Sequence, residues 1–202
     1  MSACCKRESS QSNTCNSNEP SKEKVQDDDS SLNEEDKKIV KSIWNHVQKD
    51  PTNAAIKLFI RFFNDNPSYV QLFSFRDLSL EQLKESKKLK AHASSVVYAI
   101  SSIVDNLDDM DCCAELITRI NSRHTSRGVT TEMYHNLAKS TVAFLKEFVG
   151  SDEMNVKAEK AWGKVFAIIV AVFESCKQSE SNESKSSETT NTSTSTPKTK
   201  TP

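Results

Sequence analysis

Hydrophobic positions in the middle of the chain recur every three or four residues, a spacing that places side chains on one face of an α-helix. The first stripe follows Asn33, a residue type that often caps a helix N-terminus. A second apolar segment runs from Ala54 to Phe63 and precedes Pro67, whose ring and missing N–H disfavour a longer helix. The first stripe consists of Ile39, Val40, Ile43, Trp44 and Val47. The pattern predicts two helices followed by a turn.

Four further stripes have the same helical spacing. Ser86 is placed to cap a long helix, Gly128 to end the shorter helix after it, and Gly150 to end the next. The stripes comprise Leu89, His92, Ala93, Val96, Ile100, Ile103 and Leu107; Leu116, Ile117, Ile120 and His124; Met133, Tyr134, Leu137, Phe144, Leu145 and Phe148; and Ala158, Trp162, Val165, Phe166, Ile169 and Phe173. With only 3 Gly in the chain, hairpin turns are scarce. We therefore expect an all-α bundle of six or more helices.

Both ends of the chain contrast with this middle region, because they contain almost no large apolar side chains. We expect residues 1–31 and the Ser/Thr-rich residues 177–202 to be disordered tails, since such segments bury too little apolar surface to fold. One domain, residues 32–176, remains. A domain of roughly 145 residues can sustain a core without disulfides or metals.

Composition narrows the functional classes. The formal net charge is −1 and no basic region stands out, so nucleic-acid binding is not expected. The 6 Cys lack metal-site spacing, and no apolar N-terminal run marks a secretion signal, so we expect a cytoplasmic, non-secreted protein. The longest apolar run, 165–173, is about half of the roughly 20 residues that cross a bilayer.

Two histidines, His92 and His124, lie on the apolar stripes of separate predicted helices. A single such histidine is most often a core residue bonded to a carbonyl, but leaving two imidazoles buried and unpaired costs about 1–3 kcal/mol each. Zinc is disfavoured because no third and fourth ligand shares these stripes. Haem needs only two axial ligands, and the absence of a CxxCH motif indicates that it is held non-covalently. Candidate pocket-lining residues are Phe59, Phe73, Val96, Ile120, Val129 and Tyr134.

Several motifs fall in the order and spacing of a known family. Trp44, the FFNDNP run ending at Pro67, Phe73, KLKAH at 88–92 and RHTSRGV at 123–129 resemble the globins, over about residues 32–176. The likeness is strongest to the intracellular neuroglobin and cytoglobin type, although the cysteine pair that forms a loop disulfide in some neuroglobins is missing. The resemblance implies a three-over-three helical sandwich around haem b.

The resemblance also implies roles for individual residues. His124 matches the proximal iron ligand, His92 the distal histidine, and Phe73 the aromatic residue that packs against the porphyrin. Phe59 falls where myoglobin-like members usually have leucine, which favours bis-histidyl iron in the ligand-free state. Arg123 or Arg127 is a candidate partner for a haem propionate.

Three functions stay open. The leading hypothesis is reversible binding of O2, CO and NO for oxygen storage, transport or sensing, with a cellular reductase as partner. The alternatives are a redox enzyme that acts as an NO dioxygenase, nitrite reductase or peroxide scavenger, and a signalling module that a protein partner reads. Acylation of Cys4 and Cys5, which precede Lys6 and Arg7, would attach the chain to a membrane.

Overall fold

The computed structural model describes the backbone of residues 31–187 and the side chains of residues 31–178. This part of the chain is all-helical and contains no strand, which confirms the expected fold class. Its elements are α1 (Glu34–Gln48), α2 (Pro51–Asp65), the 3₁₀ helix η1 (Pro67–Leu72), α3 (Leu80–Lys84), α4 (Lys87–Asp105), α5 (Met110–Thr125), α6 (Thr131–Val149) and α7 (Val156–Ser187). None of the described helices is both long enough and apolar enough to cross a membrane.

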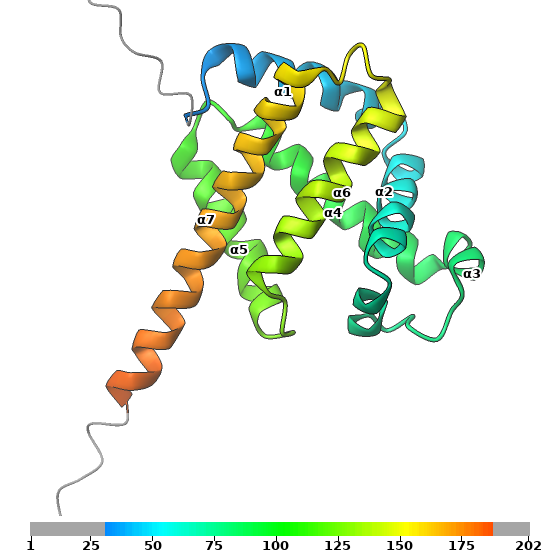
Figure 1. Ribbon diagram of the computed structural model, residues 1–202. Helices are drawn as coiled ribbons and strands as arrows, with labels where there is room; N and C mark the ends of the chain where they lie inside the picture. The colour runs from blue at the N-terminus through cyan, green and yellow to red at the C-terminus, as the bar shows by residue number, and fades with distance from the viewer. Residues whose placement is uncertain (1–30, 188–202) are drawn as a thin grey trace, which may run out of the picture.

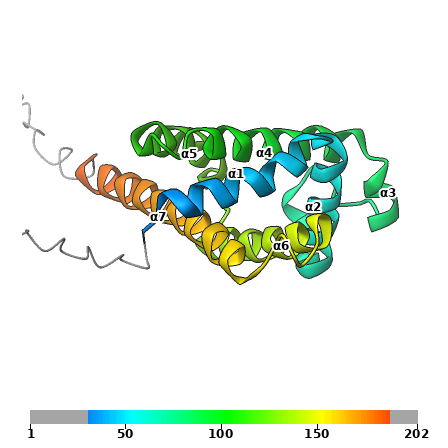
Figure 2. The same ribbon diagram turned by 90° about the horizontal axis from the view of Figure 1, so that it is seen from above.

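The helices form two layers, with α4 and α5 on one side and α6 and α7 on the other (Figures 1 and 2). Helix α2 closes one end by packing on both α4 and α6, while α7 packs on α1, α5 and α6. Every long helix therefore turns its apolar stripe toward a shared interior.

Polar residues set the helix ends as the sequence predicts. The Asn33 side chain accepts a hydrogen bond from the Asp36 backbone N–H, and Ser86 caps α4 through the N–H of Leu89. Gly150 follows α6 with φ of 95°, a left-handed conformation that glycine adopts without strain. The capping residues thus fix where the helices that carry the site begin and end.

Two tryptophans join the layers. Trp44 of α1 and Trp162 of α7 are fully buried, with ring centroids 5.3 Å apart. The Trp44 indole N–H donates to the Ser101 hydroxyl of α4 at 2.9 Å, so a single side chain links α1, α4 and α7. This packing holds α4 in place against the rest of the fold.

Two features differ in detail from the sequence expectation. The short α3 begins at Ser79, which forms a capping box with Gln82, although only α4 was expected in this region. Helix α7 continues past Cys176, the expected end of the domain, to Ser187. The remainder of the two expected disordered tails, residues 1–30 and 188–202, lies outside the described residues.

Candidate functional site

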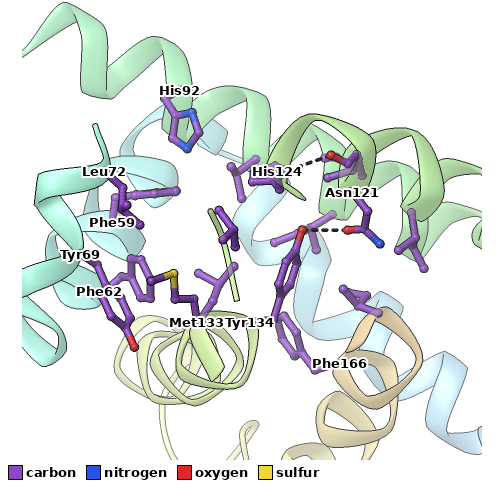
Figure 3. Close-up of a pocket in the computed structure, with 18 of the residues that line it drawn as sticks. Phe59, Phe62, Tyr69, Leu72, His92, Asn121, His124, Met133, Tyr134 and Phe166 are labelled. Atoms are coloured by element: carbon purple, nitrogen blue, oxygen red, sulfur yellow. Dashed lines mark hydrogen bonds between the residues drawn. The ribbon is translucent and has the colours of Figure 1, made fainter. Parts of the chain in front are cut away.

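A cavity opens between α4 and α5 on one side and α6 and α7 on the other, and Figure 3 shows its inner part. All eight residues expected from the sequence line it: Phe59, Phe73, His92, Val96, Ile120, His124, Val129 and Tyr134. The inner part has a volume of about 130 Å³ and the outer part, toward the surface, about 880 Å³. The inner part alone is smaller than the roughly 300–1,000 Å³ of usual small-molecule and cofactor sites, so a large ligand would extend into the outer part. The two histidines border both.

His124 lies near the C-terminal end of α5, one turn beyond Ile120. Its Nδ1–H donates to the Ile120 backbone carbonyl at 2.9 Å. Because a carbonyl oxygen only accepts, this bond places the proton on Nδ1 and leaves the lone pair on Nε2. A histidine that is oriented in this way is the usual form of a metal-bound imidazole.

His92 points from α4 into the cavity between two aromatic rings (Figure 3). The Phe59 ring stands edge-on to the imidazole at 5.2 Å, and the Phe73 ring does so at 5.1 Å. No side-chain hydrogen bond involves His92 within the described residues, which leaves its imidazole without the carbonyl partner of an ordinary core histidine. Burial, reinforced by repulsion from His124 and Arg127, lowers the pKa of His92 to about 4, so the ring is neutral near pH 7.

A polar pair interrupts the apolar wall behind His124. The Tyr134 hydroxyl donates to Asn121 Oδ1 at 2.8 Å, and the Asn121 amide nitrogen is buried without a partner. Burial raises the pKa of Tyr134, which keeps its hydroxyl protonated and able to donate. The Tyr134 ring also contacts His124, with centroids 6.1 Å apart. The pair thereby connects α6 to the helix that carries His124.

The outer part of the cavity has a different chemical character. Four cationic side chains line it, Lys88 from α4 and Arg119, Arg123 and Arg127 from α5 or just beyond it, and no acidic side chain does. Arg127 donates to the Arg123 backbone carbonyl. This mouth suits a ligand that carries its negative charges at the outer edge of an apolar body.

Some residues of the site were not predicted from the sequence. Asn121 and the cations Lys88 and Arg119 were not singled out, nor were several apolar residues of the inner wall. Asn121 carried a usable signal, because it lies three residues before His124 and interrupts the stripe of Ile117 and Ile120. The apolar residues that were missed are Phe62, Tyr69, Leu72, Ala99, Ile100, Ile103, Ile117, Met133, Leu137, Phe166 and Ile169.

The remaining histidines and thiols of the described residues lie outside the cavity lining. His46 Nε2 lies 2.9 Å from a carboxylate oxygen of Glu153, and His135 is exposed on α6. The Cys113 thiol is buried and donates to the Asn106 carbonyl at 3.1 Å. Among the described residues, no group of three or more His, Cys, Asp or Glu is arranged to hold a metal ion.

These residues fit a haem. The inner walls are apolar, two imidazoles border the cavity with a ring nitrogen free in each, and the mouth is cationic where the macrocycle's two carboxylates would lie. The sequence model of the Globin family matches residues 56–173, more than half of the chain. This protein belongs to the globin family. Membership implies a haem-binding protein whose ligands are gases such as O2.

Relatives place this globin near the neuroglobins and cytoglobins. Cytoglobin-1 of Danio rerio is 28% identical over 142 residues, covering 69% of this chain and 82% of the relative. Neuroglobin of Dissostichus mawsoni is 24% identical, covering 69% and 89%. A solved globin structure from Drosophila melanogaster has a TM-score of 0.66 at 24% identity, covering 71% of this chain and 94% of that one. A hexa-coordinate haemoglobin of the same organism, solved with cyanide, also has a TM-score of 0.66, at 23% identity, covering 70% and 93%.

Proposed function

We propose that this globin holds haem b non-covalently, with His124 as the proximal ligand and His92 on the opposite side, and binds O2, CO and NO reversibly. The observation that carries the proposal is the pair of imidazoles bordering one apolar cavity, each with a free ring nitrogen. The proposed role is oxygen storage, transport or sensing, with a cellular reductase that keeps the protein ferrous.

Haem, when bound, supplies an iron with two axial positions, at which a histidine or a gas can bind. The chain contributes orientation and exclusion of water. The Ile120 carbonyl holds the His124 ring with Nε2 free. The apolar walls, which include Phe59, Val96, Ile120 and Val129, would contact the flat hydrophobic macrocycle. Phe73 borders both parts of the cavity and would pack against the macrocycle.

The proposal includes bis-histidyl coordination in the absence of gas. The low pKa of His92 supports it, because only a neutral imidazole has a lone pair to donate. A hexa-coordinate haemoglobin also occurs among the solved structures of this fold. If His92 competes for the sixth position, the apparent gas affinity falls by the fraction of molecules in which that position is open.

The visible spectrum of the dithionite-reduced protein without O2 or CO tests this proposal. We expect sharp, split bands for the wild type and one broad band for His92→Leu, because leucine cannot occupy the sixth position. A broad band already present in the wild type would reject bis-histidyl coordination and retain an open gas site. A purified protein that takes up no haem would reject the proposal as a whole.

The cationic mouth favours a second candidate function, reduction of nitrite. Nitrite is an anion, and the four cations would raise its local concentration at the cavity entrance. NO dioxygenation is a related candidate activity, because it also needs a cellular reductase to return the iron to the ferrous state. Sustained turnover with a cellular reductase, far faster than stoichiometric oxidation, would support this enzyme function.

We propose that the protein is located in the cytoplasm and is attached to membranes by acyl chains on Cys4 and Cys5. Both cysteines lie outside the described residues. Two acyl chains hold a protein on a bilayer far better than one. A tethered globin of this kind could act as a signalling module. Membrane fractionation of wild type and the Cys4→Ser/Cys5→Ser variant tests the attachment, which unchanged fractionation of a membrane-bound wild type would exclude.

A further inference from the structure

Three arginines form a ladder along one face of α5 and its end. Arg119, Arg123 and Arg127 are spaced by four residues, the spacing that aligns side chains on a helix, and all three are exposed. Together with Lys88 across the cavity mouth they make up what we call the basic rim. Within the described residues none of these four cations forms an ion pair, and the same holds for other exposed cations such as Lys49 and Lys160.

Haem binding would not neutralise the basic rim. A protoporphyrin has two carboxylates, whereas the rim has four cations, so at least two positive charges stay available to another partner. The favourable position of cations near a helix C-terminus accounts for Arg123 and Arg127, and Arg127 also bonds to the Arg123 carbonyl. Lys88, at the start of α4, and Arg119, in the body of α5, have no such explanation.

One exposed leucine lies at the cavity mouth beside this charge, and two more follow it in the chain before α4 begins. Leu72, Leu78 and Leu80 are 45%, 37% and 38% exposed, and they are three of the six large hydrophobic residues that are exposed in the described part of the chain. We call these three residues the apolar corner. Leu72 lines the cavity mouth together with the basic rim. Figure 1 shows η1 and the end of α5 at the same edge of the molecule, opposite α1 and the start of α7.

We propose that the basic rim and the apolar corner form one face that binds an anionic phospholipid membrane. Cations attract acidic headgroups, and leucines beside them can enter the interface between headgroups and acyl chains. An acidic protein would match the basic rim but would gain little from the exposed Leu78 and Leu80, which do not line the cavity. The combination of both features on one edge therefore favours a lipid surface over an acidic protein.

The face would also complete the membrane attachment that we propose for Cys4 and Cys5, although it does not depend on it. A single acyl chain gives only reversible binding, and a basic patch is one of the second signals that make attachment stable. Membrane contact at this edge would place the cavity mouth against the bilayer. Apolar gases concentrated in the lipid would then reach the haem cavity directly.

The test uses full-length, haem-loaded protein produced without acylation, so that Cys4 and Cys5 add no lipid. Sedimentation with phosphatidylcholine vesicles, with and without phosphatidylserine, measures membrane partitioning at fixed ionic strength. We compare wild type with Lys88→Gln/Arg119→Gln. The matched control, Lys49→Gln/Lys160→Gln, removes two exposed cations from the end of α1 and the start of α7, at the opposite edge of the fold.

We expect wild type and the control to bind only the phosphatidylserine vesicles. Each cation near an anionic surface contributes roughly five-fold to partitioning, so Lys88→Gln/Arg119→Gln should bind about 25-fold more weakly. If the wild-type protein does not sediment with phosphatidylserine vesicles at low salt, the proposal is overturned. Equal loss in the rim variant and the control would also overturn it, because binding would then depend on overall charge alone.

A second pair of probes separates a membrane from an acidic protein. Leu78→Gln/Leu80→Gln changes only the apolar corner and should weaken vesicle binding while leaving binding to a polyglutamate peptide unchanged. Binding of polyglutamate without binding of phosphatidylserine vesicles would assign the basic rim to an acidic protein partner and reject the lipid proposal. The spectrum of the bound haem is read in every variant, so loss of haem and loss of membrane binding are told apart.

Discussion

The Nδ1–H of His124 donates to the backbone carbonyl of Ile120, one turn earlier in α5, at 2.9 Å. The bond fixes both the orientation of the ring and its tautomer, so that Nε2 is the nitrogen left to bind a metal. Ile120 itself lines the cavity. The same stretch of helix thus supplies the proposed ligand, the group that orients it and part of the apolar wall.

Replacing His124 by alanine should abolish stoichiometric haem binding, because no other side chain of α5 lies where the imidazole does. Titration of the apo-protein with haem, followed by absorbance, measures the loss. His135→Ala is the matched control, since this histidine is exposed on α6 and outside the cavity. Tight one-to-one haem binding by His124→Ala would show that the proximal ligand has been misassigned.

Replacing His92 by leucine should change how CO binding depends on CO concentration. If His92 occupies the sixth position, the wild-type rate levels off at the rate at which the imidazole leaves, whereas His92→Leu has no such limit. Stopped-flow mixing of each reduced protein with CO at increasing concentrations measures the binding rates of the wild type and of His92→Leu. A wild-type rate that rises linearly to the highest CO concentration would contradict the bis-histidyl assignment.

The helical fold and the two histidines could be predicted from the sequence because both depend on local spacing. Stripes with a period of three to four residues show which side chains face inward, and His92 and His124 lie on such stripes. The capping box at Ser79 and Gln82 was an equally local signal for α3, yet this helix has too few residues to form a stripe. Helix ends were therefore easier to foresee than short helices.

The inner wall of the cavity depends on which helices meet, and this is not a local property. Phe166 and Ile169 of α7 were recognised as apolar, but nothing in their own segment shows that they face His124 across the cavity. Two of the four cations of the basic rim, Lys88 and Arg119, were missed for the same reason. Lys88 and Arg119 are 31 positions apart, and only the packing of α4 on α5 brings them to one mouth.

Replacing Tyr134 by phenylalanine should lower the free energy of unfolding by about 1–2 kcal/mol, because Asn121 would lose its hydrogen-bond donor inside the core. Urea unfolding of the apo-protein measures the change. Tyr98→Phe is the control, since Tyr98 is 59% exposed and the same change should cost less than about 0.5 kcal/mol. Equal effects of the two substitutions would mean that the Tyr134–Asn121 bond adds no stability.

The ion pair between Asp36 and Lys164 should make stability depend on acid pH. The two side chains are 13% and 14% exposed, and Lys164 donates to Asp36 at 2.8 Å, linking α1 to α7. Burial alone would raise the pKa of Asp36, but the bonds from Lys164 and from the Asn33 backbone outweigh it and hold this pKa below its ordinary value. The pair's contribution is therefore present above about pH 4 and is lost as the pH falls through the lowered pKa.

Asp36→Asn should accordingly lower the free energy of unfolding by about 1–3 kcal/mol at pH 6, because it removes a charged acceptor from a half-buried ammonium. The difference from wild type should shrink as the pH approaches 3, where the wild-type carboxylate takes up a proton. Urea unfolding at both pH values measures this, with Glu34→Gln as the control, since the Glu34 side chain is 75% exposed. A difference that stays constant from pH 6 to pH 3 would show that the stability lost in Asp36→Asn does not come from the charge of Asp36.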